Sequence, residues 1–329
     1  MDNRVLREQL GPALRENVVI RDYLPTGVGG VVDYLFIAET IESLAKAVTT
    51  ARKLSLSHVV IGQGSNVLFS DIGFPGLVIL NRTNKIAFAL NKSQVIADSG
   101  VLLSRLIMEV ATRDLTGLEF LFGLRGSIGG ATVNNRQANG VSIGKLVKGL
   151  TLLMPDGKVT HYRGSWMDWQ PLSSRLMRCR AADGTTVLPI ILTVTLQLSQ
   201  NKKEEILRKI QHFGRFNKQL WPLEEPSIGP IFKDLSSDES AEAFLQGISL
   251  KRVKVGQARV FPRQPNFILT REGRLGVGKT ADIYELVKQM KQMVKEQYGQ
   301  NLEEAFEYLG TWDLEPSYLS ETDDLIEYE

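Results

Sequence analysis

The residues with the clearest chemistry form a glycine-rich loop directly after an apolar run. The run His58-Val59-Val60-Ile61 predicts a buried strand, and the loop after it reads Gly62-Gln63-Gly64-Ser65-Asn66. Two glycines let backbone N–H groups approach an anion closely, and a hydroxyl and an amide can add hydrogen bonds. The loop therefore predicts a phosphate or pyrophosphate site. It lacks the third glycine of the dinucleotide pattern GxGxxG, which disfavours a Rossmann fold, and an ordinary strand-to-loop turn is the alternative.

A second glycine cluster follows the same logic. It spans residues 117–131 and reads GLEFLFGLRGSIGGA, with Gly126, Ser127, Gly129 and Gly130 closely spaced. Two such loops from neighbouring units can hold one extended diphosphate cofactor between them.

A third motif, at residues 273–280, matches the phosphate-loop pattern GxxxxGK(S/T) with the sequence GRLGVGKT. It follows a strand-like run and opens a helix, as that motif requires. Residues 281–329 supply neither a repeated βα series nor an apolar strand ending in an acidic magnesium ligand, both of which nucleotide hydrolysis needs. A nucleotide hydrolase is therefore the weaker alternative, and a chance match in a glycine-rich chain is the simpler explanation.

Strands and helices alternate along the chain and must position these loops. Val31 to Ala38 is an apolar, β-branched run, and Thr40 after it can cap a helix. Pro155-Asp156-Gly157 lies between two extended runs and predicts a hairpin, because proline presets φ and glycine accepts a positive φ. Further strands are expected at 77–80, 95–97, 187–198, 253–261, 266–270 and 302–309, and helices at 41–51, around 102–115, from Lys202 and at 281–298.

The composition is that of an ordinary globular chain. Its 329 residues suggest about two domains, and a formal net charge of +2 gives no global basic field for nucleic acid. A single cysteine, Cys179, excludes an internal disulfide framework, and three scattered histidines disfavour a structural zinc site. The sequence shows neither a signal peptide nor an apolar run of roughly 20 residues. We therefore expect a cytoplasmic protein with no membrane span and no nucleic-acid partner.

The last residues, 311–329, differ from the rest in charge. They contain seven Asp or Glu residues and no Lys or Arg, so this acidic tail carries −7 and the remainder of the chain +9. Such a segment is typical of a solvated, disordered end. The alternative is that the tail docks onto the basic body or a protein partner, with four apolar anchors: Trp312, Tyr318, Leu325 and Tyr328.

The order of several motifs resembles the UDP-N-acetylenolpyruvoylglucosamine reductase (MurB) family. The resemblance begins with the sequence TGVGG at 26–30, the loop GQGSNVL and the second glycine cluster. It continues with IGPIFK at 228–233, similar to the family's GSxFKNP, with QPNFI at 264–268, similar to HxNFI, and with TAD at 280–282. LEEAFE at 302–307 occupies the place of LxPEVR. The resemblance covers roughly residues 15–310 and absorbs the phosphate-loop match, since the family has an ordinary strand-to-helix turn there.

The resemblance implies an α+β fold. A two-part FAD-binding domain of the vanillyl-alcohol-oxidase (PCMH) type is followed by a MurB-type C-terminal substrate domain. The expected ranges are 1–85 for the small α/β part, 86–200 for the larger sheet part, 201–310 for the substrate domain and 311–329 for the acidic tail. The implied reaction belongs to peptidoglycan precursor synthesis. NADPH, through FAD, reduces the enolpyruvyl ether of UDP-N-acetylglucosamine to UDP-N-acetylmuramate, so a UDP-sugar is the implied ligand.

The cofactor positions implied by the resemblance are mostly retained. Arg125, however, replaces a family proline, and Arg136-Gln137 replace Ala-Gly in the family's NAGA segment, which brings side chains toward space that a flavin needs. We expect bound FAD, with NADPH only if the chain is active. The expected cofactor-binding residues are Gly62, Gln63, Gly64, Ser65, Asn66, Gly126, Ser127, Gly129, Gly130 and Asn135.

The positions of the family's catalytic groups carry other residues. The family's Tyr-Arg pair falls on Trp169-Gln170, its acid serine on Pro230 and its glutamate on Ala305. These changes remove the bidentate cation for a carboxylate and the proton donor. If residues 302–309 form one strand, Glu303 and Glu307 share the face of Ala305 but are displaced by about 7 Å at roughly 3.4 Å per residue.

We therefore expect a family member that has lost the reaction or been redirected to a binding or regulatory role. The alternative is an active UDP-N-acetylmuramate dehydrogenase with substitute residues such as Glu303, Glu307 or Ser227.

Overall fold

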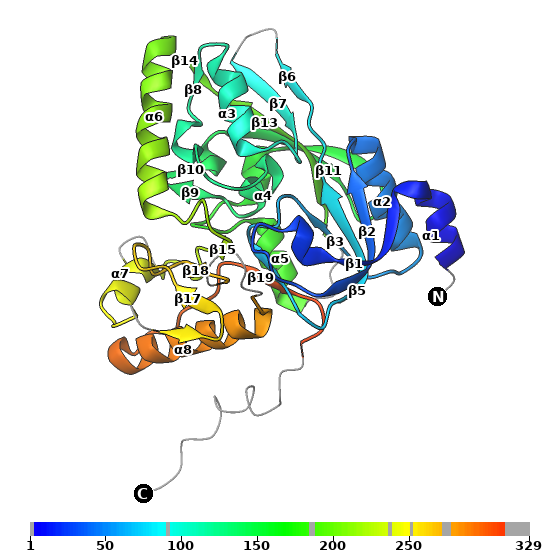
Figure 1. Cartoon of the computed structure of the whole chain (residues 1–329). Coiled ribbons are helices and arrows are strands. Elements are labelled where there is room, and N and C mark those ends of the chain that lie inside the picture. The colour runs from blue at the N-terminus through cyan, green and yellow to red at the C-terminus, as the bar shows by residue number, and fades with distance from the viewer. Residues whose placement is uncertain are drawn as a thin grey trace, which may run out of the picture.

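A computed structural model describes residues 3–89, 93–183, 188–235, 239–250, 253–271 and 278–312 of the chain. It contains three main sheets, each with its own helices, and a short ladder that joins the last part of the chain to the first (Figure 1). Short 3₁₀ helices cover Gly11–Ala13, Ile20–Tyr23, Glu119–Leu121, Ile143–Lys145 and Gly164–Met167.

The first sheet has the order β1-β2-β5-β3, with β1 Leu14–Val19, β2 Val31–Ala38, β5 Phe74–Asn81 and β3 His58–Ile61. Strands β2, β5 and β3 run parallel, and β1 pairs antiparallel with β2. Helices α1 (Asn3–Leu10) and α2 (Ile41–Lys53) pack against each other beside this sheet. The predicted cap of α2 is confirmed: Ser43 N donates to Thr40 Oγ1, and Thr40 N donates to Ser43 Oγ, both at 3.1 Å.

The second sheet is antiparallel, in the order β12-β11-β13-β7-β6. The predicted hairpin between β11 and β12 is confirmed, with Gly157 at φ +83°. Two short ladders, β8–β14 and β9–β10, and four helices accompany the sheet. The bounds are β6 Ile86–Phe88, β7 Gln94–Asp98, β8 Leu115–Thr116, β9 Gln137–Ala138, β10 Val141–Ser142, β11 Val147–Leu153, β12 Val159–Arg163, β13 Ile190–Gln197, β14 Ser199–Gln200, α3 Leu103–Ala111, α4 Ile128–Val133, α5 Arg175–Asp183 and α6 Lys203–Leu220.

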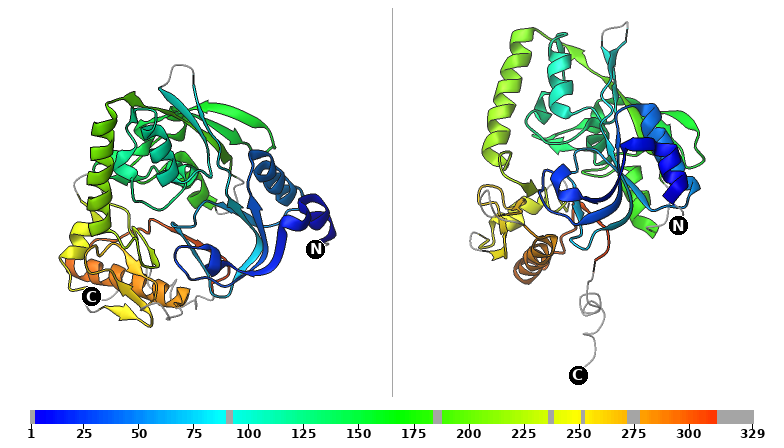
Figure 2. Two further views of the ribbon diagram at one scale, coloured as in Figure 1. Left: turned by 45° about the horizontal axis from the view of Figure 1, so that its top comes forward. Right: turned by 45° about the vertical axis from the view of Figure 1, so that its right-hand side comes forward.

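The third sheet is also antiparallel, in the order β15-β18-β17-β16. Its strands are β15 Ser227–Ile228, β18 Ile268–Leu269, β17 Ala258–Val260 and β16 Lys254–Val255, with helices α7 Ala241–Gln246 and α8 Thr280–Tyr298. The prediction of one strand over 253–261 is wrong: Gly256, at φ +50°, turns the chain into the β16–β17 hairpin. The two views in Figure 2 show this part below α6.

The final predicted strand, 302–309, is also shorter than expected. Only β19, Glu307–Leu309, pairs with β4, Val67–Phe69, in parallel register. The residues before it pair elsewhere, because Ala305 N donates to Ile231 O at 2.7 Å and Lys233 N to Glu303 O at 2.9 Å. The chain therefore changes partner between 305 and 307, and regular alternation does not extend across 302–309.

Part of the predicted phosphate-loop motif, residues 272–277, lies outside the described residues. Its last residue begins α8, where Asp71 Oδ2 accepts from Thr280 N at 2.7 Å and from Ala281 N at 3.2 Å. Thr280 Oγ1 in turn accepts from Asp71 N at 2.9 Å. A carboxylate of the protein thus takes the helix terminus that a phosphate would need.

The acidic tail is outside the described residues from 313 onward. Trp312, one of its predicted anchors, packs on the chain's own Tyr308, with ring centroids 5.2 Å apart. No helix in the described part of the chain combines the length and the apolar character needed to cross a bilayer.

Because Asp71, in the turn between β4 and β5, caps α8, we predict that Asp71→Ala lowers the free energy of unfolding by about 1–2 kcal/mol. Urea unfolding followed by circular dichroism measures this. The control is Asp33→Ala, which removes an exposed carboxylate from β2. Equal midpoints for the two variants would contradict the capping role.

Candidate functional site

One large cavity lies where the three main sheets and their helices meet. Its volume is about 1390 Å³, larger than the few hundred to about 1000 Å³ of common small-ligand sites. Its wall combines β3 and the loop 62–67, the second glycine cluster, part of α5, and residues 303–308 without Ala305. Both predicted glycine loops therefore contribute to one cavity.

The two loops are held together by direct contacts. Gln63 Oε1 accepts from Gly126 N at 2.5 Å. A Cβ at Gly62 would overlap Ser127 Oγ, so only glycine permits this approach. On the other side, Arg82 Nη1 donates to Gly62 O at 2.6 Å. The first loop is fixed on both flanks before any ligand binds.

The first loop leaves backbone donors available. In the part of the chain that the structure describes, no protein oxygen accepts from the N–H groups of Gly64, Ser65 and Asn66. Gly64 has φ +70°, the left-handed conformation that successive N–H groups adopt around an anion. Gly64 is buried, and Ser65 and Asn66 are half-buried. Unpaired N–H groups away from water are costly, so these three donors suit a phosphate group.

The second loop supplies open space. The nearest atoms to a Cβ at Gly126 or Gly130 would lie 3.7 and 3.5 Å away, so both glycines keep that part of the wall clear. Gly129 has a different reason for being glycine: its N–H donates to Ser99 O at 2.8 Å, and a Cβ there would press on Ser99. Together the loops fit a diphosphate, with donors on one and clearance on the other.

A buried polar layer supports the loops, and sequence reasoning missed it. Asn81 Nδ2 donates to Ser99 Oγ at 2.8 Å, and Asn81 Oδ1 accepts from Thr83 N at 3.1 Å. Asp98 Oδ2 accepts from Lys85 N at 3.0 Å, and burial raises the pKa of this carboxyl. The available signal was an Asn ending the apolar strand β5, where a core residue is expected.

Three side chains were expected to intrude on the flavin. Among the described residues, only one of them lines the cavity without a hydrogen-bond partner for its polar group. Arg125 lies on the wall, but its guanidinium donates to Leu223 O and, at 3.3 Å, to Glu225 O. Gln137 is in β9 and is not among the lining residues. Arg136 lines the cavity beside Trp221, with its Cζ 5.2 Å from the ring centroid.

Asn135 is not on the cavity wall, although it was expected to bind the cofactor. It is buried, its Nδ2 donates to Gln170 O at 2.7 Å, and its Oδ1 accepts from Gly144 N at 3.0 Å. Its role in this structure is to connect the loop after α4 to the segment that contains Gln170.

The three family catalytic positions do not line the cavity either. Gln170 is exposed, Pro230 is half-buried beside Gly229, and Ala305 is buried. The backbone carbonyl of Ala305 accepts from Asn66 Nδ2 at 2.9 Å, so this position meets the first loop through its main chain.

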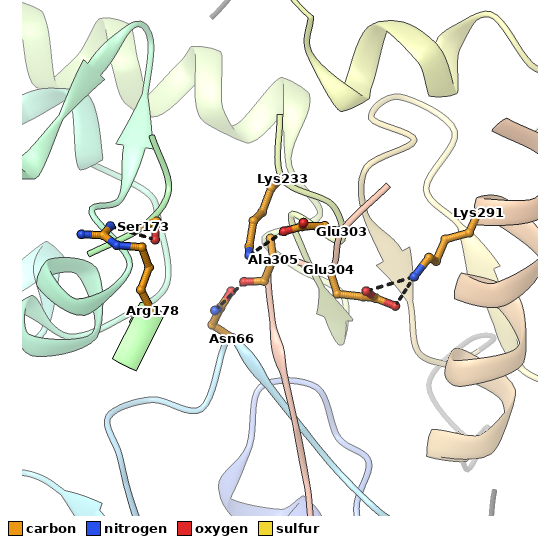
Figure 3. Close-up of polar contacts among 8 residues, drawn as sticks. All are labelled: Asn66, Ser173, Arg178, Lys233, Lys291, Glu303, Glu304 and Ala305. Atoms are coloured by element: carbon orange, nitrogen blue, oxygen red, sulfur yellow. Dashed lines mark hydrogen bonds and ion pairs between the residues drawn. The ribbon is translucent and has the colours of Figure 1, made fainter. Parts of the chain in front are cut away.

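The charged groups of the wall are mostly paired (Figure 3). Lys233 Nζ lies 3.2 Å from Glu303 Oε2, and Lys291 Nζ lies 3.1 Å from Glu304 Oε1. Arg178 lies across from them with Ser173 and pairs with Asp168 at 2.5 Å.

The substitute residues named from the sequence have different positions. Glu303 and Glu307 line the cavity, whereas Ser227 does not. Ser227 is buried, and its hydroxyl donates to Pro222 O at 3.2 Å and to Glu225 O at 3.1 Å. Among the described residues, no three His, Cys, Asp or Glu side chains are grouped to hold a metal ion.

Comparison with known proteins agrees with this architecture. Residues 32–163 match the family model described as FAD binding domain. Residues 221–309 match the model of the UDP-N-acetylenolpyruvoylglucosamine reductase C-terminal domain. The chain thus carries the FAD-binding (PCMH-type) domain and the MurB-type C-terminal domain that its sequence predicted.

Individual relatives carry the same name. UDP-N-acetylenolpyruvoylglucosamine reductase of Bacillus pumilus is 28% identical over 94% of this chain and 98% of its own length. That of Clostridium novyi is 29% identical over 88% and 90%. The crystal structure of MurB from Thermus caldophilus superimposes with a TM-score of 0.72 at 29% identity, covering 90% of this chain and 99% of that one. In sequence and in fold, the chain is similar to the UDP-N-acetylenolpyruvoylglucosamine reductase family over about nine tenths of its length.

Proposed function

We propose that this chain binds FAD against its two glycine loops, binds a UDP-sugar in the rest of the cavity, and does not perform the family's reduction. The observation that carries the last part is the wall itself: Gln170, Pro230 and Ala305 place neither a cation nor an acid on it. The relatives' name supplies the substrate class, a UDP-linked aminosugar.

The residues present fit FAD. The N–H groups of Gly64, Ser65 and Asn66 are the expected donors to its diphosphate, and Gly126 and Gly130 leave the room that it needs. Arg125, which replaces the family's proline, is held by two carbonyl oxygens of the segment after α6 and does not require that room. When bound, FAD supplies hydride transfer.

The position of the family's proton donor carries no acid in this chain, and this argues against turnover. Reduction of an enol ether requires a proton at carbon, from a group within about 3 Å of that atom. Pro230 has no acidic proton, and Ser227 is hydrogen-bonded to two carbonyls away from the cavity. Glu303 forms an ion pair with Lys233, with 3.2 Å between Nζ and Oε2. Of the substitutes considered, Glu303 and Glu307 line the cavity.

We predict that the FAD-loaded protein shows no substrate-dependent oxidation of NADPH with UDP-N-acetylglucosamine enolpyruvate, while calorimetry detects binding of that ligand. Absorbance at the NADPH band follows the first, and an active family reductase in parallel confirms the reagents. Substrate-dependent turnover would contradict the proposal and favour the alternative of an active dehydrogenase with substitute residues. Glu307→Gln would then test whether that carboxyl supplies the proton.

Flavin retention tests the first glycine loop. Gly64→Ala places a Cβ at φ +70° against Leu24, which displaces the loop's N–H groups, and we predict at least about tenfold weaker FAD binding. The flavin spectrum after desalting measures it. Gly299→Ala is a matched control, because Gly299 has φ +69° after α8 and a Cβ there would meet no atom within 4 Å. Equal retention by the two variants would rule the loop out as the diphosphate site.

A further inference from the structure

Arg136 differs from every other arginine on the cavity wall in that its guanidinium has no hydrogen-bond or ion-pair partner among the described residues. Arg52 donates to Met154 O and Leu188 O at 2.7 Å, Arg125 donates to two carbonyls, and Arg178 pairs with Asp168. In the described part of the chain, no oxygen accepts a hydrogen bond from the Arg136 guanidinium. Within the described residues, this cation therefore has no counter-ion.

The backbone fixes where Arg136 lies. Arg136 N donates to Ala131 O at 2.8 Å, and Arg136 O accepts from Ile143 N at 3.0 Å. Its neighbour Asn135 is bonded to the carbonyl of Gln170. The Cα of Arg136 is therefore held in place by hydrogen bonds on both sides.

Trp221 provides the second fixed surface. The guanidinium carbon of Arg136 lies 5.2 Å from its ring, and that ring packs on Phe267 with centroids 5.5 Å apart. A cation above an aromatic face keeps its N–H edge free, and that edge is the part that binds a carboxylate or phosphate in a bidentate manner. The pair joins the loop after α4 to the segment that follows α6.

Burial makes an anion favourable at this place. It lowers the pKa of Arg136 to about 10, so the group remains charged near neutral pH but is poorly solvated. A half-buried charge without a partner is unfavourable until a counter-ion arrives, and Arg136 lines the cavity from which such an ion would come.

We propose that Arg136, which lines the cavity and packs against Trp221, forms an oxyanion subsite for a carboxylate or diphosphate of the bound nucleotide sugar. It is distinct from the N–H groups of the first loop. The subsite deepens the proposed function and rests on it for the identity of the ligand. It assigns a binding role to a residue that replaces a small one in the family's pattern.

The test measures binding of two probes to the FAD-loaded protein by calorimetry. UDP-N-acetylmuramate carries a carboxylate and a diphosphate, and UDP-N-acetylglucosamine carries the diphosphate alone. Arg136→Gln is expected to weaken binding about tenfold or more. If Arg136 binds the carboxylate, only UDP-N-acetylmuramate loses affinity. If Arg136 binds the diphosphate, both probes lose affinity. Arg208→Gln, an equal charge change on the outside of α6, is expected to change neither.

Unchanged affinity of Arg136→Gln for both probes overturns the subsite. So does a loss of FAD with both affinities intact, since the anion would then be the cofactor's. Urea unfolding without ligand adds a check on folding, because Arg136→Gln removes an unpaired charge and is expected to be no less stable than the parent protein.

A third probe, inorganic pyrophosphate, separates this inference from the proposed function. If the parent protein binds neither UDP-sugar, the proposed function fails, and inorganic pyrophosphate titrated against tryptophan fluorescence then decides the subsite alone. A fluorescence change that Arg136→Gln removes supports the subsite, because the anion would lie beside Trp221. No change in the parent protein overturns it.

Discussion

The parallel pairing of β4 with β19 is the constraint on which the cavity depends. Val67 pairs with Glu307 and Phe69 with Leu309, so two segments far apart in sequence start from one fixed register. The residues just before them are also joined, because Asn66 Nδ2 donates to Ala305 O. The loop with free N–H donors and the wall with Glu303 and Glu307 are therefore one rigid corner, and neither moves without the other.

Position 305 shows what this corner requires. The backbone on either side of it is committed, with its N–H to Ile231 and its carbonyl to Asn66, so the side chain is the only variable part. A buried Ala305 satisfies that geometry at no desolvation cost, whereas a carboxylate there needs a partner or water. The wall therefore keeps its architecture without the family's acidic group, because main-chain bonds support it.

Local sequence signals predicted the elements well where the cause is local. Thr40 caps α2 and Gly157 turns the β11–β12 hairpin, since each effect acts within a few residues. The partner switch at 303–307 and the off-wall position of Asn135 depend on residues distant in sequence, such as Ile231 and Gln170. The glycine loops were found because both functions of glycine, donor access and clearance, leave a mark in the sequence. By contrast, the support that Asn81 and Ser99 give to the loops appears in the sequence only as ordinary polar residues, so the sequence did not predict it.

The residues that depart from the family's pattern affect ligand binding and proton transfer differently. Binding an oxyanion needs a cation anywhere along its edge, so a guanidinium at Arg136 can serve in a cavity where Gln170 is neutral and faces solvent. Proton transfer is far less tolerant, because an error of about 1 Å in position can cost a hundredfold in rate. In this chain, Pro230 and Ala305 replace the family's acid groups, and Arg136 adds a cation without an ion-pair partner among the described residues. We therefore expect the chain to keep its recognition of an anionic ligand and to lose the turnover of that ligand.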